Sequence, residues 1–170
     1  MTANRSRRIV LISAAVLLAS CYALATVADT QEPAKTAAPK KVAKSGPAAK
    51  HKVGIQVSQN DKALMDLALN NAKNIIEHYK AKGETVAIEI VTYGPGLHML
   101  RADTSPVKDR IAPMALENAN LKFIACANTQ ANQSKAEGKP VTLVSEAKVM
   151  PSGVVRLMEL QKQGYAYIRP

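Results

Sequence analysis

The chain has 170 residues, and its 23 lysines and arginines outnumber its 13 aspartates and glutamates, giving a formal net charge of +10. Most of this excess precedes residue 53, because residues 53–170 carry 14 basic and 11 acidic residues and are long enough for one hydrophobic core but not two. Proteins that bind nucleic acid concentrate basic and aromatic side chains on a folded surface, so this distribution argues against a nucleic-acid partner.

The first 28 residues have the organisation of an export signal. Three arginines precede an uncharged segment, residues 9–28, in which Ala23-Leu24-Ala25 is typical of a cleavage site. We expect a cleaved signal segment over residues 1–28 and a periplasmic location for the domain that follows. Two alternatives stay open: Cys21 ends a lipobox-like sequence and would be lipidated, or the uncharged segment would remain as an uncut membrane anchor.

Residues 29–52 are rich in alanine, lysine and proline. The prolines interrupt any long helix, and no apolar period is present, so we predict a disordered linker. Its lysines either keep the segment solvated or bring it to anionic lipid or cell-wall polymer. Membrane or envelope association through the N-terminus is therefore one expectation.

The first half of the domain, which spans residues 53–170, is predicted to alternate strands with helices. Val53–Ser58 is an apolar strand, and Asn60 or Asp61 begins a helix that stops near Gly83. Val86–Thr92 is the second strand, after which a Tyr-Gly-Pro-Gly turn leads to a short helix. The inward stripe of the long helix is predicted to comprise Leu64, Met65, Leu67, Ala68, Leu69, Ala72, Ile75, Ile76 and Tyr79.

The middle of the domain contains a helix and the most apolar strand. Ser105 is predicted to cap a helix that Pro113 kinks or splits. Leu121–Cys126 is apolar apart from one lysine, which is typical of a central strand covered on both faces. Residues 127–138 are polar, and we predict a loop with one helical turn.

The last third supplies two more strands and a helix. Ala147–Met150 is the fourth predicted strand, Ser152 caps the last helix, and Tyr165–Arg169 is the final strand. The alternation predicts a single three-layer α/β domain with a mainly parallel central sheet. The inward residues of the last helix are predicted to be Val154, Val155, Leu157 and Met158.

Cys126 is the strongest candidate for chemistry. In parallel sheets ligands collect outside the carboxyl ends of the strands, where Cys126 lies, followed by Asn128 and Thr129. A thiol beside helix amides has a lowered pKa and reacts as thiolate. If Cys21 is cleaved off or lipidated, Cys126 has no partner within the chain, which indicates a reactive thiol or an intermolecular pair. The alternative is a buried core cysteine.

The turn after the second strand is a second candidate. Tyr93, Gly94 and Gly96 either form an anion-binding cradle of backbone amides or only close the connection. His98 either donates a proton beside Cys126 or is an ordinary exposed histidine. The sequence lacks a phosphate loop, a dinucleotide fingerprint, a zinc ligand pattern and a hydrolase nucleophile elbow, so we expect neither a cofactor nor a metal.

Five short segments occur in a fixed order within residues 53–170. The segments are Asn70-Asn71-Ala72-Lys73-Asn74, Glu89-Ile90-Val91-x-Tyr93-Gly94-Pro95-Gly96, Phe123-x-x-Cys126-x-Asn128-Thr129, Pro151-Ser152-Gly153-Val154-Val155 and Gly164-Tyr165-Ala166-Tyr167-Ile168-Arg169-Pro170. Together they closely resemble the DsrE/DsrF-like family in its stand-alone exported form, and the resemblance covers residues 53–170.

This resemblance implies a DsrE-like fold, a homo-oligomer that is a trimer or hexamer, and sulfur relay between partner proteins as cysteine persulfide. Cys126 would carry the persulfide, in a sulfur carrier or in a sulfur-responsive protein, and the partner would be a sulfur-donor or sulfur-acceptor protein. Any enzymatic role would be at most sulfur transfer. The alternative is a non-catalytic oligomeric module that binds a small anion or a partner protein in the periplasm.

Overall fold

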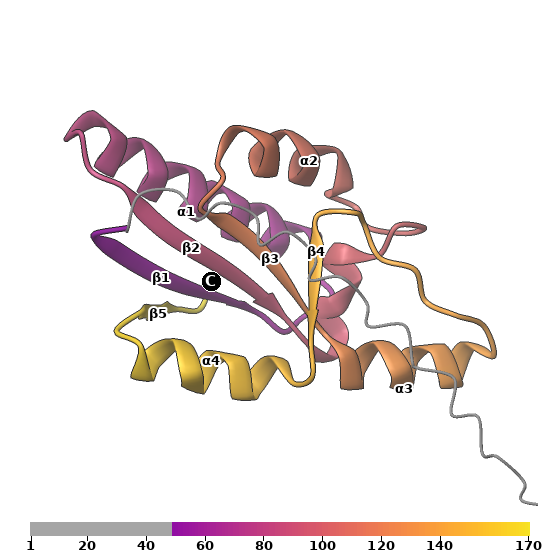
Figure 1. Cartoon of the computed structure of the whole chain (residues 1–170). Helices are drawn as coiled ribbons and strands as arrows, with labels where there is room; N and C mark the ends of the chain where they lie inside the picture. Colours follow the sequence, from indigo (N-terminus) through magenta and orange to yellow (C-terminus); the bar gives the residue numbers. More distant parts are fainter. Residues whose placement is uncertain (1–48) are drawn as a thin grey trace, which may run out of the picture. The chain divides into compact units, whose positions relative to one another are not determined.

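The computed structural model describes residues 49–170; the proposed signal segment, most of the linker and Cys21 lie outside the described residues. Strands and helices alternate along the described chain (Figure 1). In chain order the elements are β1 (His51–Val57), α1 (Lys62–Ala81), β2 (Val86–Thr92), the 3-10 helix η1 (Gly94–Leu100), α2 (Lys108–Glu117), β3 (Leu121–Cys126), α3 (Ala127–Glu137), β4 (Ala147–Met150), α4 (Gly153–Lys162) and β5 (Ala166–Ile168).

The five strands form one sheet in the order β4-β3-β2-β1-β5, and every neighbouring pair is parallel. This confirms the predicted α/β class and parallel sheet. The bounds of β2, β3 and β4 match the predicted strands. β2 and β3 are mostly buried apolar runs, which suit strands covered by helices, whereas β4 at the edge of the sheet has no buried residue. β5 is shorter than predicted.

Helices cover both faces of the sheet, as Figure 1 shows for α1 and α2 on one side and α4 on the other. The larger core lies beneath α1, α2 and η1, where Ile55, Ile90 and Phe123 are fully buried. Burying each such side chain stabilises the fold by about 1.5–3 kcal/mol. A smaller core joins the other face of the sheet to α4 and contains Val91, Ile124, Leu157 and Leu160.

α1 begins where the sequence predicts it. The Asp61 carboxylate accepts hydrogen bonds from the backbone N–H groups of Ala63 at 2.7 Å and Leu64 at 3.2 Å, which caps the helix. Its inward stripe is narrower than predicted, and Leu67 is 47% exposed. Leu67 lies two positions after Met65, so the helical twist turns it away from the sheet. The buried residues of α1 are Met65, Ala68, Leu69 and Ala72.

The predicted start of α2 is wrong. The Ser105 hydroxyl donates to the carbonyl of Met99 at 2.5 Å and accepts from the N–H of Val107 at 3.3 Å, so Ser105 closes a buried turn before the helix. α2 begins at Lys108 and continues through Pro113 without being split.

The predicted inward face of α4 is also wrong in part. Leu157 is buried, but Val154, Val155 and Met158 are each about half exposed. The buried residues of α4 are Gly153, Leu157 and Leu160, which follow helical spacing on the opposite side. Apolar residues lie on both sides of this helix, so the pattern could not identify the inward one.

The predicted loop over residues 127–138 is an 11-residue helix, α3. It has no buried residue, so its sequence lacks the helical spacing of apolar residues from which a helix is predicted. At the other end of the domain, β1 begins at His51, two residues before the predicted strand. The His51 ring stacks on Tyr79 with 3.8 Å between ring centroids, which extends the ordered structure toward the linker. No helix among residues 49–170 is long and apolar enough to cross a membrane.

Candidate functional site

The candidate site lies at the carboxyl ends of β2, β3 and β4. These strands are neighbours and parallel, so the segments that follow them meet at one edge of the sheet. η1 follows β2, α3 follows β3, and α4 follows β4. Cys126 is the last residue of β3 and pairs with Met150, the last residue of β4.

Cys126 also occupies the N-cap position of α3, with extended backbone angles. The neutral side chain makes no capping hydrogen bond. Donors nevertheless lie close to it: the hydroxyl and backbone N–H of Thr129, and the N–H of Gly153 at the start of α4. The N–H of Asn128 donates to the carbonyl of Pro151 at 3.3 Å. The amino ends of two helices therefore converge on one sulfur atom, and helix amino ends favour negative charge.

Opposing influences set the pKa of the Cys126 thiol. Burial is the largest and raises the pKa. Hydrogen bonding to the thiolate from the Thr129 hydroxyl, and from the N–H groups of Gly153 and Thr129, outweighs burial, so the pKa lies below its ordinary value of 9.0. The arrangement favours thiolate, the nucleophilic form of cysteine.

Access to Cys126 is narrow. The residue is 5% exposed, whereas Ala125 beside it is fully buried. α4 packs closely against it, since a Cβ added at Gly153 would lie 3.0 Å from the Cβ of Tyr93 and 3.4 Å from the Cβ of Cys126. Gly153 was not among the site residues predicted from the sequence. The signal that could have found it is its place directly after Ser152, the predicted helix cap.

The turn after β2 acts on Cys126 through Thr129. The N–H of Gly94 donates to the Thr129 hydroxyl oxygen at 3.0 Å. With its oxygen occupied in this way, the Thr129 hydroxyl can direct its proton to the thiolate. The Gly94 amide therefore acts on the sulfur through the Thr129 hydroxyl, whereas the sequence predicted that the backbone amides of the turn bind an anion directly.

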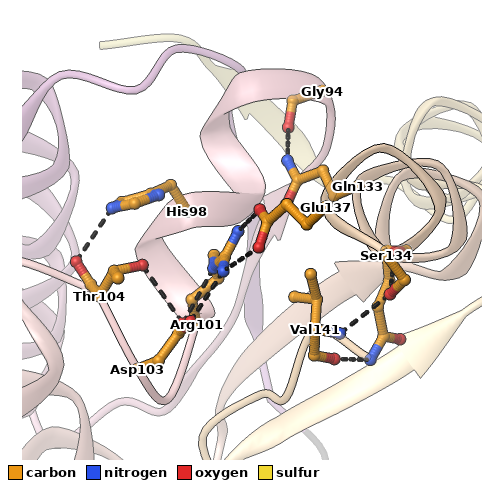
Figure 2. Close-up of polar contacts among 10 residues, drawn as sticks. Gly94, His98, Arg101, Asp103, Thr104, Gln133, Ser134, Glu137 and Val141 are labelled. Carbon is orange, nitrogen blue, oxygen red and sulfur yellow. Dashed lines mark hydrogen bonds and ion pairs between the residues drawn. The ribbon is translucent and has the colours of Figure 1, made fainter. Parts of the chain in front are cut away.

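Two other residues that the sequence suggested for the site, Gly96 and His98, both lie in η1. A Cβ at Gly96 would lie 2.2 Å from the carbonyl oxygen of Val57, so this glycine permits η1 to pass close to β1. The Nε2 atom of His98 lies 2.9 Å from the carbonyl oxygen of Thr104 (Figure 2). His98 is not among the groups that shift the pKa of Cys126.

A shallow pocket of about 370 Å³ adjoins the site. It includes Gly94 and Thr129, the two residues that link the turn to the thiol. The complete lining is Gly94, Pro95, Thr129, Asn132, Gln133 and Ala136. Among the residues that the structure describes, no cluster of three or more His, Cys, Asp or Glu side chains could hold a metal ion.

Comparison with known proteins supports the fold and leaves the activity open. No protein-family model and no curated protein matches this chain. A solved structure is similar: a protein of unknown function, MTH1491 from Methanobacterium thermoautotrophicum, with 29% sequence identity and a TM-score of 0.60. The match covers 71% of this chain and 99% of that one. This chain thus shares its α/β fold with a protein whose own function is unknown.

Proposed function

We propose that this chain is an exported DsrE-like protein that carries sulfane sulfur as a persulfide on Cys126. The observation that carries the proposal is the convergence of the α3 and α4 amino ends and the Thr129 hydroxyl on the Cys126 thiol. These donors favour a thiolate at a position that retains slight exposure.

The proposed step is an exchange of sulfur between thiols. The Cys126 thiolate attacks the outer sulfur of a donor persulfide, R–S–SH, and a new S–S bond forms as the donor S–S bond breaks. The products are Cys126–S–SH and R–S⁻, whose sulfur keeps the electron pair of the broken bond. The proton stays on the transferred sulfur, and no outside oxidant is consumed. An acceptor thiolate reverses the step and restores the Cys126 thiolate.

Location and assembly belong to the same proposal. The arginine-led apolar segment before residue 29 supports export to the periplasm. The resemblance to the DsrE/DsrF-like family supports a homo-oligomer, with a sulfur donor and a sulfur acceptor as further partners. The similarity to MTH1491 is consistent with this fold assignment and adds nothing about activity.

Intact-mass spectrometry tests sulfur carriage. The full chain with Cys21→Ser, in which Cys126 is the sole thiol, is treated with polysulfide and measured before and after a reductant. We expect added sulfur atoms that the reductant removes, and none on the matched Cys21→Ser, Cys126→Ser chain. Equal sulfur addition to both chains, or none to either, contradicts the proposal.

The 5% exposure of Cys126 favours a second candidate, a non-catalytic oligomeric module that binds a small anion or a partner protein. Cys126 would then be a core residue, and the pocket beside Gly94 and Thr129 would hold the ligand. Alkylation of the native Cys21→Ser chain separates the two. Labelling that occurs only after unfolding supports the binding module, and rapid labelling of the folded chain supports sulfur carriage.

A further inference from the structure

α3 supplies the hydroxyl and the N–H of Thr129 that act on Cys126, yet it lacks the usual attachment of a surface helix. Such helices are normally held by an apolar stripe that faces the core. α3 has no buried residue. Its position relative to Cys126 must therefore depend on other contacts.

A polar stripe takes the place of the apolar one. Thr129, Gln133 and Glu137 are spaced four residues apart, so they lie on one face of α3. Thr129 accepts from the N–H of Gly94 at 3.0 Å, and the Gln133 side-chain amide donates to the Gly94 carbonyl at 3.3 Å. The Glu137 carboxylate accepts two hydrogen bonds from Arg101, one of them 2.9 Å long. Figure 2 shows Gln133 and Glu137 directed toward η1 and Arg101.

Arg101 is a rigid anchor for this stripe. It follows η1 directly, and its side chain is 7% exposed. A second pair of hydrogen bonds, 2.9 Å from Nε and 2.8 Å from Nη2, joins it to the Asp103 carboxylate (Figure 2). Bonds of this kind, with charge on both partners and a fixed guanidinium geometry, are among the strongest polar contacts in proteins.

A second group of contacts holds the middle of α3. The Gln130 side chain donates to the carbonyl of Val141 at 2.8 Å, and the Ser134 hydroxyl accepts from the N–H of Val141 at 2.9 Å. These contacts join α3 to the segment before β4. Among residues 49–170, Arg101–Glu137 is the one ion pair between α3 and the rest of the domain.

We propose that the Arg101–Glu137 ion pair is a positioning contact for Cys126. It holds the carboxyl end of α3 against η1, so that the helix presents the N–H and the hydroxyl of Thr129 to the sulfur. The contact acts through the length of the helix, over about 15 Å at 1.5 Å per residue. The inference rests on the proposed function only in treating the Cys126 thiolate as the working form.

The substitution Glu137→Gln tests this in the full chain with Cys21→Ser. It preserves side-chain size, and Arg101 keeps its bonds to Asp103. We expect alkylation of Cys126 near neutral pH to slow by about threefold, equivalent to about 0.7 kcal/mol. Amide hydrogen exchange in α3 should accelerate by about tenfold, as for the loss of a charge-assisted hydrogen bond.

The matched control is Glu77→Gln, which removes an exposed ion pair with Lys73 in α1, away from α3. It should leave both measurements unchanged. If Glu137→Gln lowers thermal stability but leaves the pH dependence of alkylation as in the parent chain, the contact is only structural and the inference is overturned. Alkylation needs no sulfur donor, so a failure of sulfur loading leaves this test readable.

Discussion

The substitution Thr129→Val removes a side-chain hydroxyl that faces the Cys126 thiol. Valine has nearly the shape of threonine, so packing is retained. The substitution removes the acceptor for the Gly94 N–H, 3.0 Å away, and the donor that stabilises the Cys126 thiolate. Thr129→Ser is the matched control, because serine keeps the hydroxyl.

The size of the effect follows from the surroundings of the sulfur. Hydrogen bonds to charged groups are worth about 1.5–3 kcal/mol. Cys126 is only 5% exposed, so water replaces the lost donor poorly. We therefore expect the fraction of thiolate near neutral pH to fall about tenfold or more in Thr129→Val, at 1.4 kcal/mol for each factor of about ten. The Gly94 N–H also loses its partner, which lowers folding stability by about 1 kcal/mol.

Alkylation with iodoacetamide across the pH range measures the effect in the Cys21→Ser background. Near neutral pH, Thr129→Val should react at about one tenth of the rate of Thr129→Ser or less. As the pH rises until the thiol is ionised in both, the two rates should converge. Coincident profiles would refute the reasoning. A uniform slowing at every pH would also refute it, because Thr129 would then control access rather than ionisation.

Three further predictions concern stability. Gly96→Ala should lower the free energy of unfolding by about 1–3 kcal/mol, because the new Cβ would lie 2.2 Å from a carbonyl oxygen of β1. An unchanged urea midpoint would contradict this close approach. Arg156→Met should lower the free energy of unfolding by about 3 kcal/mol, and by more than Glu89→Gln, because the 2% exposed Glu89 carboxylate loses two hydrogen bonds and keeps Lys122, 4.0 Å away, as its cationic neighbour; equal urea midpoints would count against this. Hydrogen bonds from Lys50 and then His51 lower the pKa of Glu84 from 4.5 to about 2, so Glu84→Gln should be less stable than the parent above pH 4.5. The difference should shrink as the pH falls toward 2, and a thermal-midpoint difference that persists in acid would refute this.

The sheet was predictable because its strands carry their own signal. Val86–Thr92, Leu121–Cys126 and Ala147–Met150 are bounded by turn residues, and their bounds agree with the structure. Helix faces were harder to predict. Leu67 and Val154 are as apolar as their buried neighbours, and only the packing of each helix on the sheet decides which side turns inward.

The position of Cys126 along the chain was predictable, but the arrangement of the site residues in space was not. The place of Cys126 at the end of β3 follows from the sequence, because an apolar strand gives way there to polar residues. The contribution of Gly153 does not, since it depends on β4 pairing with β3 so that α4 starts beside the thiol. The role of α3 was hidden because hydrogen bonds, rather than apolar contacts, hold it in place.

The pairing of the last strand of the domain with the first has a consequence during synthesis of the chain. Val53 and Ile55 of β1 align with Ala166 and Ile168 of β5. Until the ribosome has made those residues, β1 presents an open edge that can recruit strands from other chains. A chain that stops short of β5 leaves this edge uncovered permanently. Translation must therefore pass through the whole domain before its first strand is protected against aggregation.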